Sequence, residues 1–187
     1  MVPTNFLLLV NVNRQMVFLF ERSRRRHCAG QVAQQQGLAA RATRPAFIRR
    51  HYELIDAFRC STSKFGIGQQ EGSNCTPLGW HRVAKKIGGG WPVGTVFKGR
   101  QPIGFTWCGL PLAKITTRIL WLEGFEPGFN RGGNVDSFAR YIYIHGTGDE
   151  PTLGRPASHG CVHLAADDLI PLYDKLPAGT LVWIAER

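Results

Sequence analysis

The sequence predicts one mainly β domain with one or two helices. Its 187 residues, 43% of them hydrophobic, are enough to bury one substantial core and too few for two domains of ordinary size. Several short runs rich in β-branched and aromatic residues are bounded by Gly, Pro or Asn, which is typical of strands. Only one stretch has the composition of a helix, and no internal repeat is evident. We therefore expect a single domain over residues 1–187.

The first two strands are expected at residues 6–12 (FLLLVNV) and 15–20 (QMVFLF). Only Asn13 and Arg14 separate them, which predicts a hairpin. Further strands are expected at residues 52–60, 80–87, 115–122, 141–145 and 180–184. The Gly-rich segments between them, such as 66–79 and 126–134, suit loops around a site.

The best helix candidate is AADDLIPLYDKL, residues 165–176. Asp167 and Asp168 would lie in its first turn and Lys175 near its end, as the helix dipole favours. The two aspartates are therefore interpreted as helix-start acids rather than catalytic groups. Pro171 fits only near the start of a helix or at a kink.

The net charge of +10 is concentrated in one segment. Nine arginines and a single acid, Glu21, lie between residues 14 and 50. The Arg- and Gln-rich stretch at about 21–50 lacks apolar periodicity, so we expect an exposed insertion or a mobile helix-forming linker, which could contact an anionic surface. No aromatic residues alternate with the arginines of RSRRRH (22–27), and specific nucleic-acid binding is not expected.

Cysteine spacing and hydropathy bound the remaining possibilities. The five cysteines are widely spaced with no C-x-x-C pair, so neither a zinc ribbon nor a disulfide framework is indicated. No run approaches the roughly 20 apolar residues that span a bilayer. The apolar stretch at 6–10 lacks a preceding positive region and makes a poor signal peptide, so we interpret it as a strand.

The candidate site lies in PASHGCVHL, residues 156–164. Gly160 permits a tight turn before Cys161 that could point amide N–H groups at a carbonyl oxygen. His145, at the end of a predicted strand, could take the thiol proton. A helix beginning just beyond Cys161 would favour the thiolate through its positive end.

Two alternatives compete with a cysteine nucleophile. His145 and Cys161 could be ordinary core residues. In an extended chain His159, Cys161 and His163 share one face, and with His145 they could bind Zn²⁺, although the turn expected at Gly160 argues against a straight strand. The Gly-rich runs at 66–72 and 88–94 match neither a dinucleotide-binding nor a phosphate-binding loop.

The motifs IHGT (144–147) and SHGCVH (158–163) resemble the L,D-transpeptidase (YkuD-type) catalytic domain of bacterial peptidoglycan enzymes. That family pairs a His-Gly with a downstream Ser-x-Gly-Cys. The segments 76–88, 119–137 and 153–164 also resemble one bacterial branch of the family. The resemblance covers residues 5–20 and 52–185 and leaves the Arg-rich segment as an insertion.

The resemblance implies a mixed β-sheet fold and a cysteine acyltransferase that needs no metal or organic cofactor. Cys161 would attack the amide between the L-centre of a diamino acid and D-Ala in a peptidoglycan stem peptide. His145 would be the general base, oriented by the Gly146 carbonyl, and Ser158 belongs to the same motif. N–H groups around His159, Gly160 and Cys161 would hold the oxyanion.

The fate of the acyl-enzyme stays open at this point. An amine acceptor gives a cross-link, water gives an L,D-carboxypeptidase, and a non-catalytic polyanion- or zinc-binding module is the remaining alternative. The resemblance places the protein in the periplasm or cell envelope, although no convincing signal peptide is found.

One residue departs from the family pattern. His163 stands where the family usually has Arg or Asn, so a group that titrates near neutrality replaces a forked or amide donor. We expect His163 to contact substrate, and Arg155 or Arg140 could compensate for the missing arginine.

Overall fold

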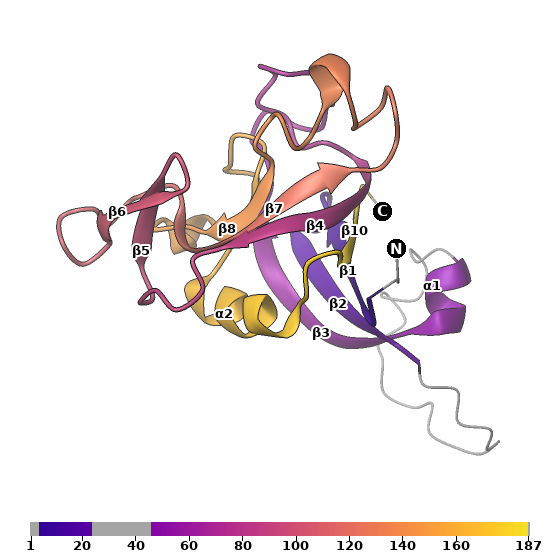
Figure 1. The fold of residues 1–187 in the computed structure, drawn as a ribbon, viewed down its shortest axis with the longest axis horizontal. Helices are drawn as coiled ribbons and strands as arrows, with labels where there is room; N and C mark the ends of the chain where they lie inside the picture. Colours follow the sequence, from indigo (N-terminus) through magenta and orange to yellow (C-terminus); the bar gives the residue numbers. More distant parts are fainter. Residues whose placement is uncertain (1–3, 24–45, 187) are drawn as a thin grey trace.

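The computed structural model describes residues 4–23 and 46–186. Ten strands form one sheet in the order β4-β10-β1-β2-β3-β9-β8-β7-β5-β6, and β4 also pairs with β7. That extra pairing closes eight strands into a ring and leaves the β5–β6 hairpin projecting at one end (Figure 1). The β1–β10 and β8–β9 pairs are parallel and the other pairs are antiparallel, which confirms a mainly β, mixed-sheet fold.

The bounds of the elements are as follows. The strands are β1 (Phe6–Asn11), β2 (Met16–Arg22), β3 (Tyr52–Ser61), β4 (Gly79–Ile87), β5 (Thr95–Lys98), β6 (Gln101–Phe105), β7 (Thr116–Gly124), β8 (Tyr143–Gly146), β9 (Val162–Leu164) and β10 (Leu181–Ala185). The helices are α1 (Ala46–His51) and α2 (Ala166–Lys175), and short 3-10 turns occupy Gly133–Val135 and Glu150–Thr152. None of the described helices is long and apolar enough to cross a bilayer.

The main core lies between the sheet and α2, which crosses below it in Figure 1. Leu169, Leu172 and Leu176 pack against aliphatic side chains of β7, β8 and β9. Asp167 and Asp168 lie in the first turn of α2, as predicted. Pro171 lies in the middle of α2 rather than near its start, so the Asp167 carbonyl lacks the usual helical N–H donor.

The predicted hairpin is confirmed, since β1 and β2 pair antiparallel from Phe6–Glu21 to Asn11–Met16. The strand expected at 141–145 begins two residues later, because Tyr141 has a positive φ of 57° that turns the chain. The sequence patterns did not predict β5, β6, β9 or α1. The predicted insertion is shorter at both ends, since β2 continues to Arg22 and α1 begins at Ala46. Its interior, with the proposed anionic-surface contact, lies outside the described residues.

Candidate active site

The two principal candidate residues come from adjacent parallel strands. In the β8–β9 pair His145 lies opposite His163, so Cys161, the residue directly before β9, is level with Tyr143, two residues earlier. Because side chains alternate along a strand, Tyr143, His145, Cys161 and His163 share one face. The residues between them, such as Ile144, point into the core on the α2 side.

Cys161 is partly buried just before β9. Its Sγ accepts a hydrogen bond from the Tyr143 N–H at 3.4 Å, and its thiol donates to the Tyr141 carbonyl at 3.5 Å. Burial raises the pKa of the thiol to about 11, although the Tyr143 N–H and the Arg140 charge act in the opposite direction. The expected thiolate next to a helix start is therefore wrong: β9 follows Cys161, α2 begins only at Ala166, and the thiol is neutral.

His145 is almost completely buried and held by its own strand. Its Nδ1 lies 2.8 Å from the Gly146 carbonyl oxygen, which can only accept, so Nδ1 carries the hydrogen and Nε2 is free to accept a proton. Burial, and then the neighbouring His163, lowers the pKa of His145 to about 3. The imidazole is therefore in its basic, neutral form at physiological pH.

The turn before Cys161 is held by the neighbouring Cys75 backbone and by hydrogen bonds of the Ser158 side chain. Gly160 has φ +117°, and a Cβ at this position would lie 3.3 Å from the Cys75 carbonyl oxygen. Ser158 is fully buried; its Oγ accepts from the Gly160 N–H at 3.2 Å and donates to the Cys161 carbonyl at 2.5 Å. Ser158 thus shapes the turn, and the Gly160 N–H is already bonded. The N–H groups of His159 and Cys161 are the other candidates for an oxyanion site.

The two histidines of the SHGCVH motif, His159 and His163, lie in different surroundings. The His163 ring lies 4.8 Å from the His145 ring, whereas the exposed His159 packs 5.4 Å from the Phe65 ring. Nδ1 of His163 is buried and has no hydrogen-bond partner among the described residues. Burial, and then His159, lowers the pKa of His163 to about 4, so the expected titration near neutrality is wrong. No three His, Cys, Asp or Glu side chains within residues 4–23 and 46–186 cluster as metal ligands would.

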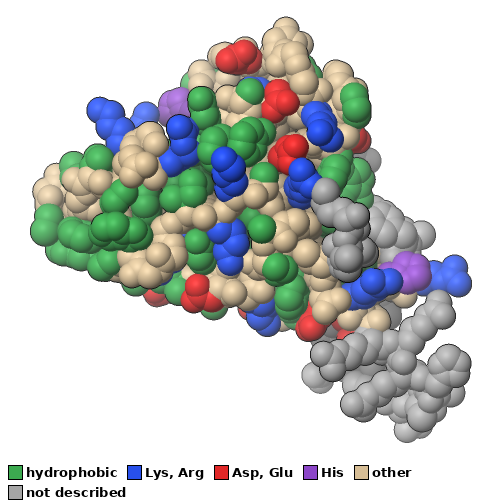
Figure 2. All heavy atoms as spheres, in the orientation of Figure 1, with side chains coloured by type: hydrophobic (Ala, Val, Ile, Leu, Met, Phe, Trp, Pro, Cys, Tyr) green, Lys and Arg blue, Asp and Glu red, His purple; other side chains and the backbone are tan. Residues whose placement is uncertain are grey.

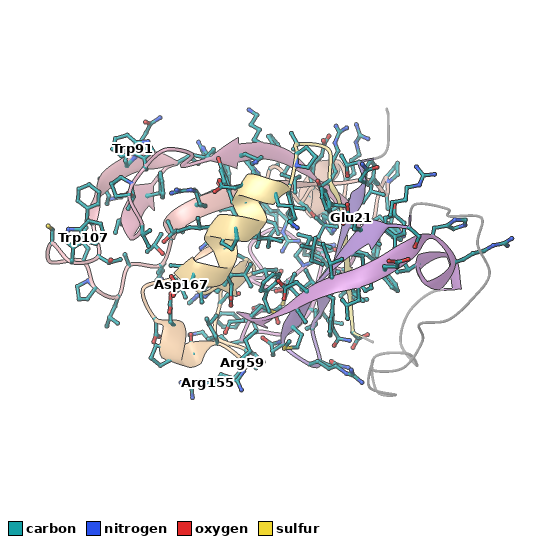
Figure 3. The ribbon with its side chains drawn as sticks, turned by 90° about the horizontal axis from the view of Figure 1, so that it is seen from below. Glu21, Arg59, Trp91, Trp107, Arg155 and Asp167 are labelled. Atoms are coloured by element: carbon teal, nitrogen blue, oxygen red, sulfur yellow. The ribbon has the colours of Figure 1, made fainter. Side chains whose placement is uncertain are left out.

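The two candidate arginines lie in different places. Arg140 is near the thiol, and its guanidinium donates to the carbonyl oxygens of Gly68 (3.3 Å), Gln69 (2.7 Å) and Cys75 (2.8 Å). It therefore ties the loop that packs on Gly160 to the strand that leads to His145. Arg155 is exposed beside Arg59 at the lower edge of Figure 3.

The sequence patterns did not indicate the aromatic side chains that line one side of the site next to the thiol, which we call the aromatic wall. Trp121 stacks on Phe138, with ring centroids 4.1 Å apart, and its ring centroid lies 5.6 Å from that of Tyr141. Arg100, from the β5–β6 hairpin, lies 5.0 Å above the Trp121 ring and 4.9 Å above the Tyr141 ring. A hairpin that the patterns did not predict thus supplies a cation to the site, and only its Lys-Gly-Arg turn could have indicated it.

Three of the solved structures that are similar to the chain illustrate the shared fold. They are Bd1075 from Bdellovibrio bacteriovorus (TM-score 0.55, 14% identity, covering 98% of this chain and 49% of that one), L,D-transpeptidase 3 from Mycobacterium tuberculosis with a faropenem-derived adduct (0.51, 14%, 97% and 60%), and the LD transpeptidase LdtMt1 in complex with imipenem (0.51, 12%, 96% and 58%). At these identities the likeness concerns the fold alone, and the chain spans at most three fifths of each structure. No curated protein sequence matches the chain.

The family assignment rests on a match along most of the chain. The YkuD family model, described as the L,D-transpeptidase catalytic domain, matches residues 40–184. These residues include β3 to β9, both histidines of the β8–β9 pair and the turn that carries Cys161. The chain therefore belongs to the YkuD family of L,D-transpeptidase catalytic domains.

Proposed function

We propose that this chain is a cysteine-dependent L,D-transpeptidase acting on peptidoglycan stem peptides in the cell envelope. The observation that carries the proposal is that His145 of β8 and Cys161, directly before the parallel strand β9, lie on the same face of the sheet. His145 has Nε2 free to accept a proton because Nδ1 is committed to the Gly146 carbonyl.

In the first half-reaction Cys161 Sγ attacks the carbonyl carbon of the bond between the diamino acid and D-Ala. His145 Nε2 takes the thiol proton as the C–S bond forms, and N–H groups of the 159–161 turn hold the oxyanion. The intermediate collapses when the C–N bond breaks, and the proton passes from His145 to the departing D-Ala amine. A thioester remains on Cys161.

In the second half-reaction an amine of a neighbouring stem attacks the thioester. His145 removes the proton from the attacking amine and returns it to the sulfur as the C–S bond breaks. The products are the cross-linked peptide and the free thiol, so no oxidant or cofactor is consumed. Water in place of the amine would give hydrolysis.

Because Cys161 and His145 are both neutral in the free protein, their protonation states determine when the proton moves from the thiol to the imidazole. A thiol with a pKa of about 11 and an imidazole with a pKa of about 3 do not exchange a proton before substrate binds. Transfer therefore accompanies attack. The developing thiolate is stabilised by the Tyr143 N–H and the Arg140 charge, and the imidazolium by the Gly146 carbonyl.

The rim of the site suits an acidic substrate. The pKa of His159 is lowered first by burial and then by the nearby charges of Lys114 and Lys64, which are both exposed. Arg100 lies over the aromatic wall. Stem peptides carry carboxylates that such cations attract. The exposed ring of Tyr141 supplies an apolar surface beside the thiol.

The test is incubation with purified tetrapeptide-containing muropeptides, followed by mass spectrometry. New cross-linked products would support the transferase, loss of terminal D-Ala alone would support hydrolysis, and neither product would contradict the proposal. Cys161→Ala should abolish both products while circular dichroism stays unchanged.

A second test uses imipenem, which is bound in one of the similar structures. Peptide mapping should locate the adduct on Cys161. Cys60 is a strong internal control because it is fully buried and burial raises its pKa to about 12. An adduct only at Cys75 or Cys108 would move the nucleophile elsewhere.

A further inference from the structure

The β5–β6 end of the molecule carries a concentrated apolar surface. Six of the eleven large hydrophobic residues that are exposed in the described ranges lie within residues 91–112. We call them the hairpin patch: Trp91, Val93, Ile103, Trp107, Leu110 and Leu112. Leu112 and Trp107 are 74% and 62% exposed. Figure 2 shows apolar side chains gathered at this end of the molecule, and Figure 3 places Trp107 at its outer edge.

The patch is a built surface rather than a set of loose side chains. Trp107 stacks on Phe105 with centroids 4.8 Å apart and lies directly against Gly94, where a Cβ would come within 2.7 Å of its ring. Leu110 packs in the same way on Gly104, where a Cβ would lie 3.2 Å from the leucine Cδ1. The loop after β6 is fixed to the main body, because the Gly148 N–H donates to the Ala113 carbonyl at 2.8 Å. Trp107 and Leu110 are therefore held in place by packing, and the loop that carries Leu112 is anchored beside it.

The segment that carries the patch has charges of one sign. Residues 88–122 contain four cations and no Asp or Glu. Lys98 and Lys114 are exposed, at the hairpin turn and after the loop. The nearest acid that lines the pocket beside Trp107 is Glu150, which accepts a hydrogen bond from the Ala166 N–H at the start of α2. The projecting segment thus combines exposed Trp and aliphatic side chains with the exposed cations Lys98 and Lys114, and Glu150 borders it from outside the segment.

We propose that the hairpin patch docks on an anionic lipid bilayer. Tryptophan prefers the membrane–water interface, aliphatic side chains enter the acyl boundary, and nearby Lys and Arg are attracted to anionic headgroups. A projecting hairpin can insert between headgroups. A protein partner would have to supply the acids that this segment lacks.

Docking in this way would set the position of the site. Arg100 belongs to the same hairpin and lies over Trp121 and Tyr141, and the Tyr141 carbonyl accepts from the Cys161 thiol. The hairpin and the wall of the site therefore form one packed unit. Insertion of the patch would hold the site near the membrane surface. That consequence rests on the proposed function, whereas membrane binding does not.

The test measures binding of the full chain to vesicles of phosphatidylcholine, alone or mixed with phosphatidylglycerol. We expect binding to the mixed vesicles, with tryptophan fluorescence quenched by lipids brominated on their acyl chains. Trp107→Ser combined with Leu112→Ser should weaken binding by about tenfold or more and remove most of the quenching. Lys98→Glu should weaken it by about fivefold.

The matched control is Ile55→Ser combined with Phe129→Ser, which removes two exposed apolar side chains outside the patch. Its vesicle affinity should change by less than about twofold. Leu112→Ser alone is a second variant, since so exposed a side chain contributes little to folding. Vesicle binding is measured without turnover, so an inactive protein can still bind.

Several outcomes would overturn the proposal. Binding that the patch variants leave intact, or that produces no acyl-chain quenching, would assign membrane contact to the arginines of residues 22–50. Loss of self-association or of binding to peptidoglycan sacculi in the patch variants, with no vesicle binding by the parent protein, would assign the patch to a second copy or to glycan.

Discussion

The two faces of β7, β8 and β9 differ in chemistry although they belong to the same three strands. On the α2 side the alternating residues are aliphatic and pack in one core, for example Leu120, Ile144 and Val162. On the other side the alternate positions carry Trp121, Tyr143, His145, Cys161 and His163. The aliphatic face is closed by a helix, and the second face is bordered by polar loops and the β5–β6 hairpin.

The difference shows how a stable sheet can hold a reactive pair. Burial on the α2 side fixes the register of β8 against β9, because a one-residue slip would place every apolar side chain on the wrong face. The same register brings Cys161 level with Tyr143, whose N–H contacts the sulfur. The aliphatic face therefore determines the geometry of the reactive face.

The largest effect should come from exchanging one residue on each face: Cys161, directly before β9, and Leu164, at the end of β9. Cys161→Ala should lower the turnover number by more than about 10⁴-fold and change the free energy of unfolding by less than about 1 kcal/mol. Leu164→Ala should cost about 2–5 kcal/mol of stability because it leaves a cavity in the core. Urea denaturation and transpeptidation assays measure the two quantities.

The folded Leu164→Ala protein is the control. It should retain a turnover number within a few-fold of the parent, on the order of the effects of mutations outside catalytic contacts. A large loss of turnover in folded Leu164→Ala, or a large loss of stability in Cys161→Ala, would contradict the separation of the two faces.

The sequence predicted the fold and the reactive pair because both depend on local patterns. Strand runs bounded by Gly and Pro indicated β1, β2, β3, β4, β7 and β10 within a few residues. The short strands were missed: β5 has four residues, β6 contains Pro102 and Gly104, and β9 has only three residues. Such strands exist because a neighbouring strand supplies hydrogen bonds, which no local pattern records.

The electrostatics of the site could not be predicted in the same way. The sequence suggested an ionised thiol and a titrating His163, whereas burial keeps Cys161, His145 and His163 neutral. Burial depends on what the tertiary fold places over each side chain. Arg140 donates hydrogen bonds to three carbonyl oxygens that lie between 65 and 72 positions earlier in the chain. Only the tertiary structure brings these groups together.

The next effect concerns acid, and the reactive face contributes to it through His145. Unfolded histidine has a pKa near 6.5, and folding lowers the pKa of His145 to about 3. Below pH 6.5 the imidazole of His145 is protonated in the unfolded chain but stays neutral in the folded chain, so stability is lost as pH falls. Between pH 7 and 5, above the range of ordinary carboxylates, the loss from His145 should be about 2 kcal/mol.

The measurement is urea denaturation at several pH values for the parent, His145→Gln and Leu164→Ala. His145→Gln should show a shallower pH dependence, since one of the depressed groups is gone. Leu164→Ala should be less stable at every pH with the slope unchanged. An equal slope in His145→Gln would mean that this imidazole does not carry the predicted linkage.

A smaller effect is expected from Arg140, which joins the reactive face to the 66–76 loop. Removing its charge in Arg140→Met should raise the pKa of the Cys161 thiol further, because the guanidinium acts to lower it. Alkylation of Cys161 by iodoacetamide should then need a higher pH, and turnover should fall by about tenfold. Arg140→Lys keeps the charge but not the forked donors. It should preserve the alkylation profile better than Arg140→Met; identical profiles for both variants would leave Arg140 a purely structural role.

The smallest effect should come from His163, the residue that departs from the family pattern. A cationic His163 that bound a substrate carboxylate would make KM rise between pH 5 and 8. With its pKa near 4, the imidazole is neutral over that range, so we expect a flat KM in the parent and in His163→Asn. The asparagine should instead act through His145, whose pKa His163 helps to lower. In His163→Asn the acid limb of the kcat/KM profile should therefore shift to higher pH. The shift should be small because burial, the larger cause of the low pKa of His145, remains. A KM that rises with pH in the parent and stays flat in His163→Asn would show that substrate binding protonates His163, and would make it a binding residue after all.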